Sequence, residues 1–415
     1  MDVIIAGGGI GGMTTALCLH RAGIRTTVFE STSDIKELGV GINLLPHAVR
    51  ELTELGLQPA LADTAIKTKE LIYHTQYGRP IWREPRGLAG GYKWPQFSIH
   101  RGALQLILLE TVRDRLGADN IVTGHHLSGF DQDDHGVTAH FTDRQTGADL
   151  PSRRGDVLIG ADGIHSALRK ALYPDEGPPA FSGVTMWRGV TETAPFLDGR
   201  TMIMAGNWNR KFVAYPISEK AALKGRSLVN WVAEIRGAHQ TLHRREDWNR
   251  TGNKSDFLPE FADWKFDWLD IPKLITQSEK IFEFPMIDRD PLPAWSFGRV
   301  SLLGDAAHPM YPIGSNGASQ AILDARVLAT ALTGKPTVEG ALKAYEAERL
   351  KPTAQVVLSN RQFGPEKVMQ LVDERCPGDC VNIHDYVTQE EMEEISLKYK
   401  TIAGFKKETL NARPT

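Results

Sequence analysis

Apolar and polar positions along the first third of the chain follow two alternating periods. Residues 3–6 form a short continuous apolar run, which is typical of a buried strand. A tract free of Pro and Gly, residues 13–22, then predicts a helix, and "TTVFE" at 26–30 predicts a second strand. Residues 45–56 and 101–117 place apolar side chains at helical spacing, and each tract ends at a glycine. This alternation of strands with helices predicts an α/β fold.

The pattern changes after residue 180. Short strand-like segments separated by polar or Gly/Pro turns occur at 185–192, 201–209, 211–218 and 227–236. Six of the nine tryptophans lie between residues 181 and 284, so we expect a mainly antiparallel sheet rich in aromatic side chains. The α/β character returns after residue 285 with a strand, a turn and a long helical tract.

These changes divide the chain into three predicted units. A discontinuous α/β domain comprises residues 1–72, 96–180 and 285–365, and a sheet domain formed by 73–95 and 181–284 is inserted into it. Residues 366–415 form a C-terminal helical region, whose last long helix opens with the capping box Thr388-x-x-Glu391. A lid, a dimer contact and a packing helix are all open alternatives for this region.

The composition is that of an ordinary globular protein. Of the 415 residues, 41% are hydrophobic and 24% are charged, and the formal net charge is −3, so neither nucleic acid nor membrane is expected as a partner. The first strand begins at residue 3, which leaves no room for a leader, and no apolar run approaches the roughly 18 residues of a membrane span. Cys18, Cys376 and Cys380 form neither a CxxC redox motif nor a zinc site. We therefore expect no metal and a cytoplasmic location.

Five glycines occupy six consecutive positions between the first predicted strand and the first predicted helix. Gly7, Gly9 and Gly12 have the Gly-x-Gly-x-x-Gly spacing that lets a backbone turn approach a diphosphate at a helix N-terminus. Glu30 ends the second predicted strand, 23 residues after Gly7. A carboxylate there can accept hydrogen bonds from a ribose diol and repel a 2′-phosphate. We therefore predict a dinucleotide site, with a glycine-rich turn that binds nothing as the lesser alternative.

Two later segments again place small residues and an acid after a strand. Asp162 and Gly163, in "GADGIHSALRK", form a sharp turn, and Ser166 can cap the following helix. Asp305 follows the strand of "RVSLLGDAAH", and a proline-bounded loop then leads through residues 314–317 into a helix. Consecutive N–H groups in such a loop can bind an anion or a carbonyl oxygen. Each motif alone could be structural, but the three in this order predict one common ligand.

Together, the three motifs resemble the fingerprints of FAD-dependent single-component aromatic monooxygenases, the group of para-hydroxybenzoate and salicylate hydroxylases. The resemblance covers roughly residues 1–365. Within this group, the loops "GVGINLLPHAVRELTELG" and "MYPIGSNGASQAILDARVLA" are most similar to monooxygenases of the 5-methylphenazine-1-carboxylate type. The resemblance implies a Rossmann-like FAD-binding domain, an inserted antiparallel substrate-binding sheet and a C-terminal helical region.

The resemblance also implies a role for each motif. The glycine turn would lie at the FAD pyrophosphate, Glu30 at the adenosine ribose, and Arg101 near the phosphate and ribityl region, with a surface arginine as the alternative for Arg101. Asp305 would hydrogen-bond the ribityl chain. The Asp162 turn would lie near the FAD diphosphate and would also take part in binding the reduced nicotinamide. The 314–317 loop would face the pyrimidine edge of the flavin and stabilise negative charge there. The complete implied set is Gly7, Gly9, Ile10, Gly11, Gly12, Glu30, Gly41, Arg101, Asp162, Gly163, Asp305, Pro312, Gly314, Ser315, Asn316 and Gly317, with Gly41 leaving space at the isoalloxazine.

The chemistry implied by the family uses NADH or NADPH to reduce FAD, and O2 to form a flavin C4a-hydroperoxide that hydroxylates a small aromatic or heteroaromatic ring. A base or a hydrogen-bond relay would assist by deprotonating a ring hydroxyl. His308 is a candidate base, although the resemblance places it in a flavin loop. Either a monomer or a homodimer is expected.

Tyr215 is the first candidate for substrate contact, followed by Trp187, Arg188, Ile203 and Trp231. Plain packing within the sheet is the alternative for all five. No pattern in the sequence identifies a carboxylate-binding arginine or a pair of phenol-binding tyrosines. The sequence therefore does not identify the substrate.

Two other classes of function fit the same motifs. A flavin-dependent epoxidase, a Baeyer–Villiger-type oxygenase or a reductase would keep the fold and change the product. A non-catalytic FAD-binding redox sensor would need no substrate wall, so the aromatic-rich sheet argues against it. Product analysis with labelled oxygen distinguishes the enzymatic reactions from one another. NAD(P)H consumption that is not changed by added aromatic compounds would indicate the sensor.

Overall fold

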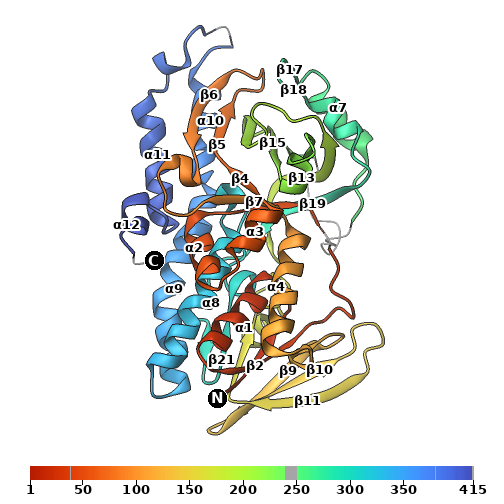
Figure 1. Ribbon diagram of the computed structural model, residues 1–415, viewed down its shortest axis with the longest axis vertical. Coiled ribbons are helices and arrows are strands. Elements are labelled where there is room, and N and C mark those ends of the chain that lie inside the picture. The colour runs from red at the N-terminus through yellow and green to blue at the C-terminus, as the bar shows by residue number, and fades with distance from the viewer. Residues whose placement is uncertain (38, 239–249, 379, 414–415) are drawn as a thin grey trace.

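The computed structural model places two large β-sheets one beyond the other along the long axis, with the helices of the C-terminal third along one flank (Figure 1). The structure describes residues 1–37, 39–238, 250–378 and 380–413. Trp248, one of the tryptophans of the predicted sheet domain, lies outside the described residues.

The first sheet has six strands in the order β20-β21-β12-β1-β2-β8. They are β1 (Asp2–Ala6), β2 (Arg25–Phe29), β8 (Ile121–Val122), β12 (Val157–Gly160), β20 (Ser296–Phe297) and β21 (Val300–Leu302). All neighbours pair in parallel except β20 and β21. Residues 3–6 of β1 are completely buried, which explains the unbroken apolar run, because parallel sheets are covered on both faces.

The second sheet has seven strands in the order β19-β13-β16-β15-β14-β5-β6. They are β5 (Glu70–His74), β6 (Pro80–Pro85), β13 (Ala180–Thr193), β14 (Thr201–Gly206), β15 (Arg210–Pro216), β16 (Ser227–Arg236) and β19 (Ile281–Asp288). Only β14 and β5 pair in parallel. The sheet is therefore mainly antiparallel, as predicted, and it takes in residues just beyond the predicted limits of 73 and 284.

Successive side chains of a strand point to opposite faces, so this sheet has two faces of different character. The outer face packs Trp187, Phe212 and Trp231 against residues 257–281 in an almost wholly apolar core. The inner face carries Tyr73, Met202, Met204 and Tyr215 among its members and packs against residues 311–313 and the C-terminal region.

Helices connect and cover the two sheets. α1 (Ile10–Arg21) packs against both α4 (Arg101–Leu116) and α8 (Gly317–Gly334), and α8 packs against α9 (Val338–Arg361). The C-terminal region forms α10 (Lys367–Arg375), α11 (Gln389–Ile402) and α12 (Lys407–Asn411); α10 and α11 lie beside β5 and β6, and α12 lies near the C-terminus (Figure 1). The remaining helices are α2 (Pro46–Glu54), α3 (Gln58–Thr64), α5 (Ala167–Leu172), α6 (Glu219–Ala222) and α7 (Ile271–Thr276).

Three small sheets complete the described fold. β3 (Gly41–Leu44), β4 (Ile66–Thr68) and β7 (Gln96–His100) form one in the order β3-β7-β4, at the passage between the two large sheets. β9 (His126–Asp133), β10 (Gly136–Thr142) and β11 (Asp149–Gly155) form an antiparallel meander, and β17 (Lys265–Phe266) pairs with β18 (Leu269–Asp270). The predicted fold class is confirmed, whereas the exact division into domains stays a prediction.

The predicted helix caps also occur in the structure. Ser166 Oγ accepts the N–H of Arg169 at 2.9 Å at the start of α5, and Thr388 Oγ1 accepts the N–H of Glu391 at 3.2 Å at the start of α11. Only half of the capping box at Thr388 forms. The Glu391 carboxylate pairs with Arg375 at 2.9 Å instead of accepting the backbone N–H of Thr388. Caps depend on residues three positions apart, so the sequence was sufficient to predict them.

Candidate cofactor and substrate site

The first glycine turn lies where β1 ends and α1 begins. Gly7 has a φ of 113°, and a Cβ there would collide with the backbone of Ala161, while a Cβ on Gly12 would collide with the carbonyl of Gly7. At Gly9, by contrast, no described atom lies within 4 Å of the position that a Cβ would occupy. The turn is therefore closed on the protein side and open on the other, as the approach of a diphosphate requires.

The start of α1 offers backbone donors to such a ligand. Gly9 is the N-cap, no side chain caps the helix, and the first backbone bond of the helix runs from Met13 N to Gly9 O at 3.0 Å. The N–H groups of residues 10–12 therefore have no acceptor within the helix. Because these donors and the helix dipole favour a negative charge, the α1 N-terminus fits the FAD pyrophosphate.

Glu30 stands beside this turn, just after β2. Gly8 N donates to Glu30 Oε2 at 2.7 Å, and Thr32 N donates to Glu30 Oε1 at 2.8 Å. The backbone thus fixes the carboxylate next to the glycine turn. The remaining lone pairs of the Glu30 carboxylate are placed to accept hydrogen bonds from the hydroxyls of a ribose.

The second motif is adjacent to the first because β12 pairs in parallel with β1. Asp162 Oδ2 accepts the N–H of Ala167 at 2.7 Å, while Asp162 Oδ1 is buried without a partner among the described residues. Burial raises the pKa of Asp162. Gly163 has a φ of 80° and open space around its Cβ position. The orphaned oxygen and this open space fit a ligand beside the glycine turn.

The third motif reaches the same place from β21. A Cβ on Gly11 would lie 2.9 Å from Leu303, so the start of α1 packs directly on the residues before Asp305. The Asp305 side chain is exposed, and Arg101 at the start of α4 is close enough to act on its charge. The structure therefore brings the glycine turn, Arg101 and Asp305 together, although they are far apart in the sequence.

His308 is held behind this loop. Its Nε2 lies 2.6 Å from Asp324 Oδ2 on α8, and Arg349 Nε lies 2.7 Å from Asp324 Oδ1. Burial opposes ionisation of Asp324, but His308 and Arg349 outweigh it and lower the pKa of Asp324 to about 2. The arrangement favours an anchoring role for His308 over that of a catalytic base.

The loop that closes the site has a strained backbone. Gly314 has a φ of 69°, and Ser315, although not a glycine, has a φ of 57°. Ser315 Oγ accepts a hydrogen bond from Asn43 Nδ2 at 3.3 Å, which ties the loop to β3. The Cβ position of Gly317 has no described neighbour closer than Asp305 Oδ1 at 3.9 Å. The helix start after the loop therefore faces open space beside Asp305, where a flavin edge would fit.

Gly41 has a different setting from the one expected. Its N–H donates to Asn230 Oδ1 at 2.6 Å, its carbonyl accepts from Arg188 Nη2 at 2.8 Å, and a Cβ there would lie 2.6 Å from Asn230 Cβ. The absent side chain thus allows β3 to lie close against the inner face of the large sheet. Its predicted role at the isoalloxazine stays a prediction.

The five predicted substrate residues divide between the two faces of the sheet. Tyr215 and Arg188 belong to the inner face, toward the cofactor loops. Trp187, Ile203 and Trp231 belong to the apolar core of the outer face, where Trp187 stacks on Phe257 with ring centroids 5.0 Å apart. This placement favours the packing alternative for all three, and their contact with a substrate stays a prediction.

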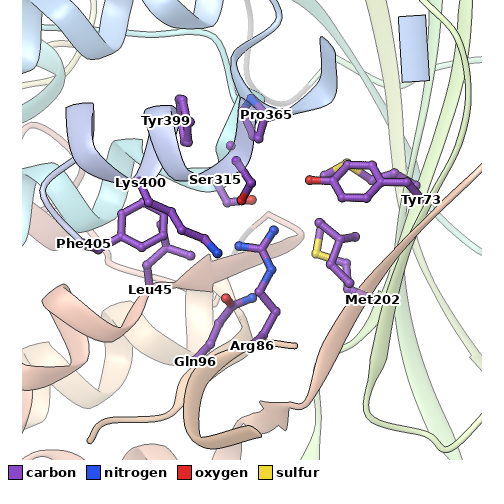
Figure 2. A pocket seen from close by; sticks show the side chains of 14 residues that line it. Leu45, Tyr73, Arg86, Gln96, Met202, Ser315, Pro365, Tyr399, Lys400 and Phe405 are labelled. Carbon is purple, nitrogen blue, oxygen red and sulfur yellow. The ribbon is translucent and has the colours of Figure 1, made fainter. Parts of the chain in front are cut away.

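A cavity lies between the inner face, the 314–317 loop and the C-terminal helices (Figure 2). Its volume is about 20 Å³, which is room for about one water molecule. Its lining consists of Leu45, Leu71, Tyr73, Arg86, Gln96, Met202, Met204, Gly314, Ser315, Pro365, Ser396, Tyr399, Lys400 and Phe405.

Sequence reasoning missed most of these residues. Met202 and Met204 do carry a signal, because they alternate along a single strand and must share a face. Arg86 and Lys400 carry none, since nothing local relates the end of β6 to a helix near the C-terminus.

Two further features of the structure lie outside the site. A disulfide joins Cys376 and Cys380, a pairing that the sequence analysis did not predict, whereas Cys18 is free and buried, and burial raises its pKa to about 12. None of the helices in the described part of the chain has the length and apolar character that a membrane crossing requires.

Comparison with known proteins agrees with this geometry. A family model described as "FAD binding domain" matches residues 1–360. Phenazine 1,6-dicarboxylic acid hydroxylase PhzS of Lysobacter antibioticus is 50% identical over 362 residues, which cover 87% of this chain and 89% of that protein. 3-Hydroxybenzoate 6-hydroxylase of Polaromonas naphthalenivorans is 32% identical over 381 residues, covering 88% of this chain and 87% of that protein.

A solved structure supports the fold over the whole length. Klebsiella pneumoniae HpxO complexed with FAD and uric acid matches with a TM-score of 0.76 at 24% identity, covering 100% of this chain and 97% of that chain. The family match, the relatives and the converging motifs lead to one conclusion: the chain belongs to the FAD-binding family of flavin-dependent aromatic hydroxylases, with FAD as its cofactor.

Proposed function

We propose that this chain hydroxylates a carboxylated heteroaromatic ring system of the phenazine class, with NADH or NADPH and O2 as co-substrates. The observation that carries the proposal is the 50% identity to a phenazine 1,6-dicarboxylic acid hydroxylase over 87% of the chain. The lining of the cavity supports it, because apolar side chains lie there together with two partly buried cations, Arg86 and Lys400.

The residues present fit FAD, as the open space at Gly9 and the orphaned oxygen of Asp162 indicate. The start of α1 would hold the diphosphate, Glu30 the ribose, and Asp305 with Arg101 the ribityl region. When bound, the flavin supplies the redox chemistry by which one oxygen atom of O2 reaches the ring.

The walls of the cavity would hold and orient the ring. Leu71, Met202 and Met204 rise from neighbouring strands of the inner face, and Phe405 approaches from the C-terminal end. Methionine sulfur is polarizable and packs well on aromatic faces, so these side chains suit a flat heteroaromatic ring. The helices that cover the cavity also exclude water from it.

Tyr215 remains our proposed substrate contact on the inner face. Burial raises its pKa to about 12, so the hydroxyl is protonated at neutral pH and serves as a hydrogen-bond donor. Arg188 lies beside it and holds the carbonyl of Gly41. We propose that Arg188 acts indirectly, by fixing β3 against the sheet.

NAD(P)H oxidation measured with a panel of aromatics tests the function. Phenazine-1-carboxylate and phenazine-1,6-dicarboxylate should stimulate oxidation, whereas 3-hydroxybenzoate should stimulate it much less. Mass spectrometry with ¹⁸O2 should show one labelled oxygen on the ring. Stimulation by the benzoate alone would overturn the phenazine class, and an epoxide, a lactone or an unlabelled product would favour the alternative reactions.

The cellular setting and the assembly are further parts of the proposal. We propose that a cytoplasmic monomer or homodimer carries out the reaction, since the described residues of one chain build both the cofactor motifs and the cavity. Light scattering on the holoenzyme measures the assembly, and a larger oligomer would contradict this part.

A further inference from the structure

We infer that Arg86 and Lys400 form a carboxylate-binding subsite in the cavity, so that the C-terminal helix α11 contributes directly to substrate selection. The inference rests on the proposed function, because it concerns the carboxyl group of the proposed substrate. It identifies two cations, one from the inserted sheet and one from the C-terminal region, that would recognise the same group.

The polar tips of the cavity lining converge on one region. Figure 2 shows the guanidinium of Arg86, the ammonium of Lys400 and the hydroxyls of Ser315 and Tyr73 directed toward the centre of the cavity. Arg86 follows the end of β6, Lys400 lies on α11, and Ser315 belongs to the loop predicted at the flavin. A group bound between the two cations would therefore lie next to the cofactor.

The positive charge in this cluster exceeds the negative charge. Glu84 is the carboxylate that both cations share: Arg86 Nη2 lies 2.5 Å from Glu84 Oε2, and Lys400 Nζ lies 2.5 Å from Glu84 Oε1. Ser396 Oγ also donates to Glu84 Oε1 at 2.6 Å. Two partly buried cations share one carboxylate, so the cluster has a net positive charge that a bound anion would compensate.

Unused donors accompany the excess charge. Arg86 Nε is buried without a hydrogen-bond partner among the described residues. The Tyr73 hydroxyl faces the Arg86 side chain, from which it can accept, and it still has its own hydrogen to donate. A guanidinium binds a carboxylate through two parallel N–H donors, and a phenol can add a third hydrogen bond. An anionic ligand would therefore supply both the missing charge and the missing acceptors.

The carboxylate on the opposite side of Tyr73 and Tyr399 is already engaged. Glu366, which acts on the charge of Tyr73 and Tyr399, pairs with Lys211, and Lys211 also lies 2.9 Å from Glu234. That second cluster has one cation for two carboxylates, so it has no positive charge to offer an anion. An anion would be attracted to the Arg86 side of the cavity and repelled by the Lys211 side.

The competing explanation is that Glu84, Arg86 and Lys400 only fasten α11 to β6. This explanation predicts that Lys400 affects stability and all ligands alike. A carboxylate subsite predicts instead an effect that depends on the carboxyl group of the ligand. The family model ends at residue 360, so Lys400 lies outside the matched part of the chain.

The experiment compares two ligands on two variants of the oxidised holoenzyme. Lys400→Met keeps the length of a side chain that is only 20% exposed and removes its charge, and Lys398→Met removes an exposed charge from the same helix as a matched control. The dissociation constants of phenazine-1-carboxylate and unsubstituted phenazine are measured by titration of the flavin absorbance. Lys400→Met should weaken the carboxylate about tenfold and leave phenazine unchanged, and Lys398→Met should change neither.

The outcomes separate the subsite from the proposed function. Equal effects on both ligands, or no effect on either, would overturn the subsite. Binding of the carboxylate that depends on Lys400 but does not stimulate NAD(P)H oxidation would support the subsite and overturn the proposed substrate. Arg86→Lys, which keeps the charge and loses the planar fork, should also weaken the carboxylate selectively, and thermal unfolding shows that this variant is folded.

Discussion

The hydroxyl of Tyr399 on α11 accepts a hydrogen bond from the side-chain amide of Asn316 at 3.0 Å. The same hydroxyl lies 3.0 Å from Asn360 Oδ1, to which it donates, and a Cβ on Gly314 would collide with the Tyr399 ring. A helix outside the family model thus supports the loop predicted at the flavin. The C-terminal region is therefore part of the site, and its effects should be measurable both at the cofactor and at the substrate.

Replacing Tyr399 with Phe should loosen this loop. The change removes one donor and one acceptor from two buried asparagine side chains, which costs about 1–3 kcal/mol of unfolding free energy. We expect a lower melting temperature and a severalfold weaker retention of FAD, measured by flavin fluorescence on dilution. Tyr386→Phe, at a 42% exposed tyrosine of the same region, is the matched control and should change neither. Unaltered retention in the Tyr399 variant would show that the loop needs no support from α11.

Asp305→Asn should weaken FAD binding with little effect on the fold. Asp305 is exposed, and no described residue donates a hydrogen bond to it, so the carboxylate is available to a ribityl hydroxyl. Asn keeps an acceptor oxygen but loses the charge, and a hydrogen bond to a charged acceptor is about 1–1.5 kcal/mol stronger than one to a neutral acceptor, which corresponds to about a tenfold increase in the dissociation constant. Asp119→Asn is the control at an exposed position elsewhere. If titration of the apoprotein gives the wild-type constant, the assignment of Asp305 is wrong.

The two faces of the large sheet should respond differently to substitution. Met204→Phe adds bulk to a cavity that has little free space, so it should raise the KM for the aromatic substrate about tenfold or more. Trp231→Phe, on the outer face, removes the hydrogen bond from Nε1 to Thr191 and leaves a void, which costs about 1–3 kcal/mol of stability. Its KM should stay at the wild-type value. A raised KM in the Trp231 variant with normal kinetics in the Met204 variant would reverse our assignment of the faces.

Acid should destabilise the protein partly through His47. This histidine is buried and stacks on Phe405 with ring centroids 5.1 Å apart, and burial, aided by Arg349, lowers its pKa to about 3. In the unfolded chain the imidazole takes up a proton below about pH 6.5, whereas in the folded protein it stays neutral until about pH 3. Its contribution to stability is therefore present above pH 6.5 and is lost as the pH falls, at about 1.4 kcal/mol per pH unit.

Urea unfolding at a series of pH values checks this expectation. His47→Leu should flatten the dependence between about pH 6 and pH 4 by one proton. His20→Leu, at an exposed histidine on α1, should leave it as in the wild type. The same slope in the wild type and the His47 variant would mean that other groups account for the acid sensitivity.

The cofactor motifs could be found from the sequence because each depends on residues close together in the chain. The close approach of Gly12 to Gly7, the cap at Ser166 and the cap at Thr388 all involve partners within five positions. Contacts between residues that are close together in the chain can be predicted from short sequence motifs. The strands of the second sheet were found for the same reason, since alternation and turn residues are local signals.

The sequence by itself determined the α/β and antiparallel elements and the three motifs that we predict at the FAD site. Only the tertiary structure decided which face of the large sheet meets the cavity, and it turned Trp187 and Trp231 outward into a separate core. It alone also placed Lys400 beside Arg86, because both cations pair with the Glu84 carboxylate. Ser396, which is 312 positions from Glu84 in the sequence, donates a hydrogen bond to the same carboxylate. The physical reason is that the alternation of side chains assigns the residues of a strand to two faces but does not determine which elements pack against each face. Those neighbours are chosen by the burial of apolar surface and the pairing of charges over the whole molecule.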